Sequence, residues 1–276
     1  MKTYLMADSV RYRGMSAREL RDTFLLNSLD EPGEVRLAYL ETDRAVVGMA
    51  CPLNSALALP CEPQLRAQYF LERRELGALN IGGAGVIHVD GQTFELNNLD
   101  CLYIGRGKRT VEFESRDTAH HAIFYLLSYP AHAEYPVALV HKEEASPTEI
   151  GSTENANCRV VCKYIHLQGA RSCQLVMGVT HLREGSIWNT MPPHTHLRRS
   201  EIYMYFNLGE NDRVFHFMGL PDETRHIILG NRNVAVSPPW SIHSGAGTHS
   251  YSFSWGMGGE NQDYSDMDAL RIADLL

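Results

Sequence analysis

Short apolar runs, separated by turn residues, repeat along most of the chain and give the strongest indication of its fold. Residues 86–89 and 92–96 are two such runs, and Asp90-Gly91 stands between them. Asp and Gly accept the positive φ angles of a tight hairpin turn, so this segment is predicted to be a β-hairpin. No long helical pattern interrupts either half of the chain. Many short strands joined by turns predict an all-β sandwich or a closed barrel.

Two short helices are expected near the ends of this β-structure. Ser16 and Glu19 have the spacing of a capping box. Apolar residues follow them at helical spacing, which predicts an amphipathic helix over residues 16–26. A terminal helix is expected over residues 263–276. Its apolar positions are Met267, Leu270, Ile272 and Leu275.

The chain consists of two weakly similar halves. In the first, NIGGAGVIHVDG is followed by DCLYIGRG, and in the second, EIYMYFNLGEND is followed by NVAVSPPWSIHSG. The polar loop over residues 143–157 is the expected boundary. Two jelly-roll halves of roughly 100 residues fit the length of the chain. We therefore expect a duplicated double-stranded β-helix, with a first domain over residues 1–145 that includes the N-terminal helix, and a second over residues 146–276.

The charge of the chain narrows the classes of partner. The formal net charge is -8 and the pI is about 5.9, and an acidic protein repels nucleic acids and anionic membranes. No apolar run is long enough to span a membrane, and the N-terminus lacks the apolar core of a signal peptide. The six cysteines form no CxxC pair, so we expect reduced, mostly buried thiols.

The most informative segment has two histidines at alternate positions, His194 and His196, followed by Glu201. Residues two apart on a strand point to the same face, so the two imidazoles can converge on one ion. Glu201 lies five residues beyond His196, and a straight strand would turn it to the opposite face. We therefore expect a bend between them, at the bulky pair Arg198-Arg199.

His243 is the fourth candidate ligand, in the Pro-rich turn SPPWSIHSG. H-x-H alone occurs often by chance, but H-x-H, then Glu after four residues, then a distant His in a Pro-rich turn is the metal-binding signature of cupins. Three imidazoles and one carboxylate suit zinc, iron, manganese, nickel or cobalt and leave positions open for water or substrate. The corresponding hairpin of the first half contains only His88, so we expect no metal there.

With these residues in place, the chain resembles the 5-keto-4-deoxyuronate isomerase family, also called 4-deoxy-L-threo-5-hexosulose-uronate ketol-isomerase. The likeness covers nearly the whole chain, from the N-terminal helix to the final MDALRIADLL. It is carried by FLERRELGALNIGGAG, WNTMPPHTH, DETRHI, SPPWSIHSG and WGMGGENQ. The resemblance implies a bicupin fold, a homohexamer and a cytoplasmic role in pectin or uronate breakdown.

The resemblance also implies one zinc ion per subunit. The family's four ligands fall on His194, His196, Glu201 and His243. Leu197 and Ser200 depart from the family pattern, where a Glu and a Met are expected. Both residues flank the site without being ligands, so the departures bear on the shape of the pocket and not on metal binding.

The implied reaction converts 5-dehydro-4-deoxy-D-glucuronate to 3-deoxy-D-glycero-2,5-hexodiulosonate, that is, a 2-hydroxy aldehyde to a ketone. A base moves the proton beside the carbonyl, and a divalent cation stabilises the charge that develops on oxygen. Candidates for the acid–base group are Tyr205, Glu223 and His226, and Tyr203 shares a strand face with Tyr205 by parity. Candidates for binding the substrate carboxylate are Arg199, Arg225 and Lys163.

Two other kinds of function stay open on the sequence. The same ligand set suits another cupin enzyme, such as a dioxygenase or a different sugar isomerase, because one fold hosts many reactions. A non-catalytic sugar-binding cupin would instead hold a structural metal and bind a uronate without turnover. The open ligand set beside candidate acid–base residues favours an isomerase over a binding protein.

Overall fold

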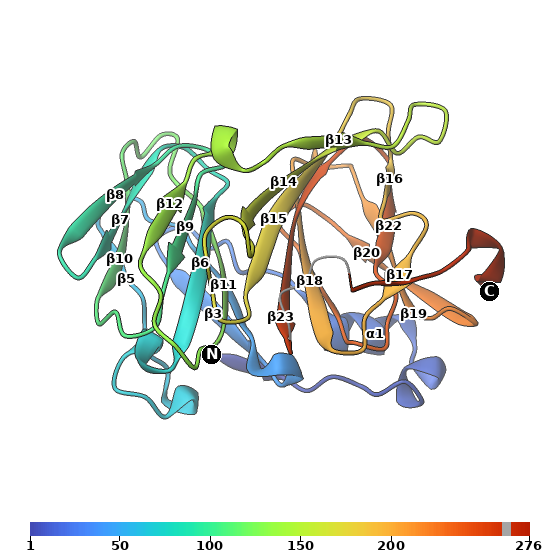
Figure 1. Cartoon of the computed structure of the whole chain (residues 1–276), viewed down its shortest axis with the longest axis horizontal. Coiled ribbons are helices and arrows are strands. Elements are labelled where there is room, and N and C mark those ends of the chain that lie inside the picture. Colours follow the sequence, from blue (N-terminus) through green and yellow to red (C-terminus); the bar gives the residue numbers. More distant parts are fainter. Residues whose placement is uncertain (261–265) are drawn as a thin grey trace. The chain divides into compact units, whose positions relative to one another are not determined.

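The computed structural model describes residues 1–260 and 266–276 and divides the chain into two compact units (Figure 1). The first unit comprises Met1–Tyr4, Ser28–Ala145 and Tyr164–Val176, and the second comprises Leu5–Asn27, Ser146–Lys163 and Met177–Leu276. Each unit contains a seven-stranded and a four-stranded sheet. This repeated pair of sheets confirms the duplicated double-stranded β-helix that the sequence predicts.

The sheets of the first unit follow the jelly-roll pattern, in which neighbouring strands are distant in sequence. The larger sheet has the order β1 (Lys2–Tyr4), β3 (Val35–Leu40), β4 (Val46–Ala50), β11 (Phe124–Pro130), β6 (Arg74–Asn80), β9 (Cys101–Ile104), β12 (Ala138–Val140). The smaller has the order β5 (Leu57–Ala58), β10 (Val111–Ser115), β7 (Gly85–Val89), β8 (Gln92–Leu96).

A buried apolar cluster in the first unit draws on both of its sheets. Leu76 and Phe124 of the larger sheet belong to it together with Phe113 of the smaller sheet. The rings of Phe113 and Phe124 lie 5.4 Å apart between centroids. Asp90 and Gly91 have φ angles of 47° and 82° and join the paired strands β7 and β8, which confirms the predicted hairpin.

The second unit repeats this plan and adds a small third sheet. Its larger sheet has the order β13 (Thr148–Ile150), β14 (Arg159–Ile165), β15 (Val176–Leu182), β23 (Ser252–Gly259), β18 (Arg199–Phe206), β21 (Val234–Ser237), β2 (Leu25–Leu26). The smaller has the order β16 (Trp188–Asn189), β22 (Ser244–Gly247), β19 (Val214–Leu220), β20 (Glu223–Leu229). Strands β17 (His194–Thr195) and β24 (Asp268–Ala269) pair with each other.

Helices are few and short. The α-helix α1 spans Ala17–Phe24, and Ser16 and Glu19 form the predicted capping box at its start. The 3-10 helices are η1 (Arg11–Gly14), η2 (Thr42–Arg44), η3 (Pro63–Leu65), η4 (Phe70–Glu72), η5 (Lys142–Glu144) and η6 (Ile272–Asp274). Among residues 1–260 and 266–276, no helix is long and apolar enough to cross a membrane.

The N-terminal helix belongs to the second unit, which corrects its expected place in a first domain over residues 1–145. The rings of Tyr12 and Phe24 pack against Trp240, at centroid distances of 4.8 Å and 6.4 Å. Tyr12 also donates a hydrogen bond to the carbonyl of Glu223 and accepts one from the amide of Leu220. These contacts join residues more than two hundred positions apart, so local sequence patterns do not reveal them.

The C-terminal segment is not the helix expected over residues 263–276. Residues 263–265 lie outside the described part, and the rest forms strand β24 and the single turn η6. Strand β24 pairs with β17, so that Ala269 stands opposite His194. The amide of Leu270 donates a hydrogen bond to the carbonyl of Pro193 at 3.1 Å. Pairing with β17 therefore replaces the helical turns that the apolar spacing suggested.

Candidate metal centre

Four pieces of the second unit supply the four predicted ligands. His194 lies in β17, His196 in the turn that follows, Glu201 in β18, and His243 in the loop just before β22. The amide of Arg199 donates a hydrogen bond to the carbonyl of His196 at 3.3 Å, which closes that turn. The chain thus bends between His196 and Glu201, as the spacing required, and Glu201 points toward the histidines.

The four side chains converge on one point. Oε2 of Glu201 lies 2.9 Å from Nε2 of His196 and 2.9 Å from Nε2 of His243. Nε2 of His243 lies 3.0 Å from Nε2 of His194. One donor atom from each of the four residues lies within 4.8 Å of all the others. A set of donors this close together surrounds a space of the size that a single ion occupies.

Backbone carbonyls orient two of the imidazoles. Nδ1 of His196 lies 3.0 Å from the carbonyl oxygen of Arg199, and Nδ1 of His243 lies 3.4 Å from that of Ser241. A carbonyl oxygen only accepts hydrogen bonds, so it favours the tautomer with the proton on Nδ1. Nε2 of each ring then presents its lone pair to the cluster, which is the arrangement that metal-binding histidines adopt.

The electrostatics of the cluster favour a cation. Burial, followed by the neighbouring His243, lowers the pKa of His194 to about 3. Burial alone would raise the pKa of Glu201, but interactions with His243 and His196 outweigh it and hold that pKa well below its usual range. Burial opposes protonation of His196, whereas its hydrogen bond to Glu201 raises its pKa. The buried carboxylate is therefore ionised and attracts positive charge.

These donors fit a divalent metal ion. Three imidazole nitrogens and one carboxylate oxygen are ligands of zinc and of the neighbouring transition metals. Only His194 and Glu201 reach the wall of the adjoining pocket, so an ion held here would be open to that side. The structure therefore brings together the four predicted residues in an arrangement that can bind a metal and leave room for a further ligand.

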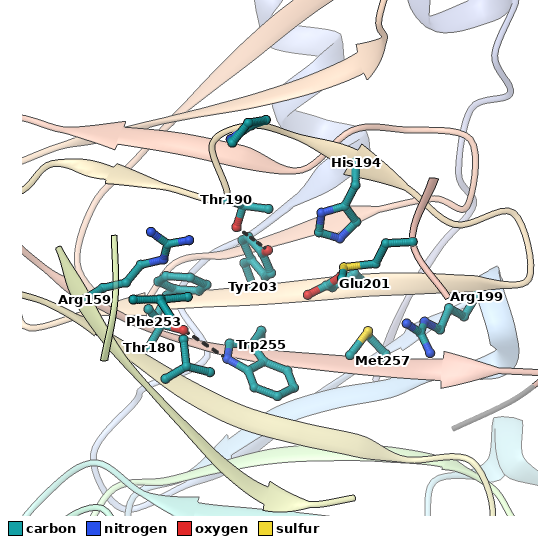
Figure 2. Close-up of a pocket in the computed structure, with 14 residues that line it drawn as sticks. Arg159, Thr180, Thr190, His194, Arg199, Glu201, Tyr203, Phe253, Trp255 and Met257 are labelled. Carbon is teal, nitrogen blue, oxygen red and sulfur yellow. Dashed lines mark hydrogen bonds between the residues drawn. The ribbon is translucent and has the colours of Figure 1, made fainter. Parts of the chain in front are cut away.

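The pocket beside the cluster has a volume of about 260 Å³. Figure 2 shows His194 and Glu201 on one side of it and Arg159 on the other, with Tyr203 between them. Apolar walls come from Phe253, Trp255 and Met257. The pocket is thus a small cavity with a metal-binding side, a cationic side and apolar walls between.

The C-terminal segment forms part of this pocket, through Met267. Just before Met267, the carboxylate of Asp266 contacts two arginines. Oδ1 lies 2.7 Å from Nη2 of Arg199, and Oδ2 lies 2.7 Å from Nη2 of Arg198. The Arg199 side chain is fully buried. This ion pair and the β17–β24 pairing fasten the C-terminal segment onto the segment that carries His194 and His196.

None of the three predicted acid–base candidates lines the pocket. Glu223 and His226 are exposed on β20, and the ring of His226 packs near Phe215. Tyr205 is fully buried and is not among the lining residues, and its Oη lies 2.8 Å from Nδ1 of His216. Burial raises the pKa of Tyr205 well above its ordinary value. Tyr203, which shares the strand face with Tyr205, is the tyrosine that reaches the pocket.

The three residues predicted to bind the substrate carboxylate lie in different parts of the structure. Arg199 lines the pocket. Arg225 donates hydrogen bonds to the carbonyls of Arg13 and Met15, so it fastens the N-terminal segment instead. Lys163, on β14, is not among the residues that line the pocket. Of these three cations, Arg199 alone is placed to meet a bound molecule.

Sequence reasoning missed Arg159 and Thr190, which both line the pocket. Arg159 and Val161 lie two residues apart on β14 and both face the cavity, so strand parity offered a signal. Thr190 lies within WNTMPPHTH, between the strands rather than on one. The two departures from the family pattern stand elsewhere: Leu197 is 72% exposed and Ser200 is buried, and neither lines the pocket.

The fold and the cluster together define the class of protein. A duplicated cupin fold whose second unit carries three histidines and one glutamate in a buried cluster is a bicupin with a group of residues that can hold a metal ion. Solved structures agree on the fold. An IolB-like protein from Salmonella typhimurium has a TM-score of 0.74 at 14% identity, with 90% of this chain and 97% of that chain covered. Oxalate decarboxylase from Lactobacillus farciminis has a TM-score of 0.61 at 12% identity, with 90% and 88% covered.

The sequence comparisons are more specific. The 4-deoxy-L-threo-5-hexosulose-uronate ketol-isomerase of Lachnoclostridium phytofermentans is 52% identical over 93% of this chain and 93% of that protein. The protein of the same name from Opitutus terrae is 46% identical over the full length of both. A family model described as the KduI/IolB family matches residues 28–272. The chain belongs to the KduI/IolB family, and it is an aldose–ketose isomerase, an intramolecular oxidoreductase.

Replacing His243 with alanine tests the ligand set. Loss of a residue that only hydrogen-bonds a metal ligand weakens metal binding by about 10- to 100-fold. His243→Ala removes a ligand itself, so its metal affinity should fall by at least about 100-fold. Metal content after dialysis against a weak chelator measures this. His226→Ala is the matched control, because His226 is exposed on β20 and should leave metal content unchanged. Retention of metal by His243→Ala at the wild-type level would contradict the assignment.

Replacing Asp266 with asparagine tests the contact of the C-terminal segment. The change leaves the buried charge of Arg199 without its carboxylate, and loss of one partner of a buried pair costs about 3 kcal/mol of unfolding free energy. Urea denaturation of the metal-free protein measures the loss. Asp274→Asn is the control, because it removes the partner of the exposed Arg271 in the same segment and should change stability little. Equal stability of the two variants would show that the Asp266 pair does not hold the segment.

Proposed function

We propose that the protein is a zinc-dependent ketol-isomerase that converts 5-dehydro-4-deoxy-D-glucuronate to 3-deoxy-D-glycero-2,5-hexodiulosonate during the breakdown of pectin and related uronates. The observation that carries this proposal is the convergence of His194, His196, Glu201 and His243 beside a small pocket, in a chain 52% identical to a protein named for this reaction. Zinc is the proposed ion because imidazole nitrogens and carboxylate oxygens are its usual ligands, and because zinc can expand to five-coordinate and so accept a substrate oxygen beside four protein ligands.

The two ends of this substrate differ in chemistry, and so do the two sides of the pocket. The substrate is a chain of six carbons with a 2-hydroxy aldehyde at one end and a carboxylate at the other. The metal-binding residues lie on one side of the cavity and Arg159 lies on the other (Figure 2). A guanidinium binds a carboxylate through two parallel hydrogen bonds. We therefore place the reacting end beside Glu201 and the carboxylate beside Arg159.

Arg199 was predicted to bind the substrate carboxylate, but we propose another role for it. It lines the pocket, but its guanidinium contacts the carboxylate of Asp266. That ion pair balances its charge, so Arg199 chiefly fixes the wall next to Glu201. Arg159 lies across the pocket from Glu201 (Figure 2), and this position makes it the stronger candidate for the substrate carboxylate.

The residues of the chain prepare the substrate for proton transfer. When bound, the metal supplies positive charge that polarises the carbonyl and stabilises the charge developing on oxygen. Phe253, Trp255 and Met257 exclude water from the reacting carbons. Trp255 is held in place by its hydrogen bond from Nε1 to Oγ1 of Thr180, at 3.1 Å. Arg159 sets the orientation of the substrate by holding its far end.

Other cupin functions are less well supported. The likeness to oxalate decarboxylase, at 12% identity, concerns the fold alone, so it gives no support to oxygen or decarboxylation chemistry. A sugar-binding cupin without activity would not need an open ligand set facing a pocket. We further propose that the protein forms a homohexamer in the cytoplasm. It acts on a small molecule and not on nucleic acid or a membrane, because its net charge of -8 repels polyanions.

Turnover of the substrate by the zinc-loaded protein tests the proposal. The substrate is prepared fresh by lyase digestion of unsaturated oligouronides, and its aldehyde signal is followed by NMR. The signal should disappear as the diketo acid forms, stop after metal removal by a chelator, and return when zinc is added. No conversion by protein that carries zinc would contradict the isomerase function, and oxygen consumption in the same sample would favour a dioxygenase.

A further inference from the structure

Ketol isomerisation needs a group that exchanges protons with the substrate oxygens. The aldehyde oxygen must gain a proton and the neighbouring hydroxyl oxygen must lose one. The histidine and glutamate of the pocket wall are committed to the metal, and arginine stays protonated at any ordinary pH. Among the described residues that line the pocket, Tyr203 carries a phenolic hydroxyl, a group that can both donate and accept a hydrogen bond.

Tyr203 stands beside the metal-binding cluster. It lies two residues after Glu201 on β18, so both side chains point to the same face of the strand and line the same pocket. Its ring centroid lies 5.6 Å from that of His243, and the two rings are nearly perpendicular, at 86°. A substrate whose carbonyl reaches the cluster therefore passes next to this phenol.

The phenol is held firmly. Its Oη lies 2.9 Å from Oγ1 of Thr190, and either oxygen can be the donor. Its ring packs on Phe253 at a centroid distance of 4.7 Å, and the residue is buried. Figure 2 shows the Thr190–Tyr203 pair in the middle of the pocket, between Glu201 and Arg159. A fixed hydroxyl pair of this kind can give a proton and take one back without moving.

We propose that Tyr203 is a catalytic residue that carries the proton between the two substrate oxygens, with Thr190 positioning its hydroxyl. This role rests on the proposed isomerase function. The phenolic O–H bond breaks as the aldehyde oxygen gains its O–H bond. The phenolate then takes the proton of the neighbouring hydroxyl as that carbon becomes a carbonyl. Tyr203 ends as a phenol, one proton has moved from oxygen to oxygen, and no oxidant or reductant is needed.

The hydrogen on carbon moves separately from this exchange. It passes with its electron pair from the hydroxyl-bearing carbon directly to the aldehyde carbon, so the C–H bond that breaks is replaced by the one that forms and no further base is needed. The exposed Glu223 and His226 on β20 lie away from the pocket wall, and Tyr205 makes its hydrogen bond to His216. Tyr203 is thus the acid–base group that the folded chain offers in place of those three.

Replacing Tyr203 with phenylalanine tests the role. The ring and its packing stay while the hydroxyl is lost, so kcat should fall by at least about 100-fold, as for loss of a general acid–base group. KM and bound zinc should stay within about twofold of wild type, because neither Arg159 nor the ligands change. Thr190→Val should give a smaller fall in kcat, since it removes the positioning hydroxyl and leaves the phenol.

Tyr251→Phe is the matched control. Tyr251 is another buried tyrosine of the second unit, and its hydroxyl hydrogen-bonds with Asn189 and the carbonyl of Ile187 outside the pocket wall. This variant should keep its kcat. The Tyr203 proposal is overturned if Tyr203→Phe keeps kcat within about threefold of wild type, or if its loss follows loss of zinc. Absence of turnover in the wild-type protein would instead refute the isomerase function itself.

Discussion

Glu201 places a carboxylate inside the second unit, 2.9 Å from a ring nitrogen of His196 and of His243. Removing a carboxylate from water costs several kcal/mol unless partners compensate for it. Here the partners are imidazoles whose other nitrogens face backbone carbonyls. A divalent cation between them would satisfy the carboxylate and the ring lone pairs at once. The turn after β17 and the register of β18 are both needed to bring Glu201 to the histidines.

The first unit also buries a carboxylate and satisfies it without metal ligands. Glu75 is fully buried in β6. Its oxygens accept hydrogen bonds from the backbone amides of Cys173, Gln174 and Leu175, at 2.7 to 2.9 Å, and from the hydroxyl of Tyr103, at 2.8 Å. Amide groups donate hydrogen bonds and, unlike the imidazoles of the second unit, direct no lone pairs to a common point where a metal could bind. The same fold thus holds a buried acid by amide hydrogen bonds in one unit and places one among three histidines, in a cluster that can hold a metal ion, in the other.

Local patterns predicted what local chemistry determines. The Asp90-Gly91 turn, the Ser16–Glu19 capping box and the bend before Glu201 follow from a few neighbouring residues. The four residues that the structure brings together in one cluster could also be picked out, because H-x-H, Glu and a distant His keep a recognisable spacing. Local patterns did not predict that the N-terminal helix belongs to the second unit, nor that the C-terminal segment forms a strand. They depend on contacts such as Tyr12 with Trp240 and β24 with β17, which join distant parts of the chain.

The pocket wall was predicted least well, for the same reason. Parity placed Tyr203 and Tyr205 on one face, but only the packed sandwich decides which of them meets the cavity and which meets His216. X-ray absorption at the zinc edge tests the central claim, that these four side chains form the metal centre. The predicted spectrum has imidazole and carboxylate ligands at about 2.0–2.1 Å and no sulfur. A sulfur shell near ~2.3 Å, drawn from the cysteines, would contradict it.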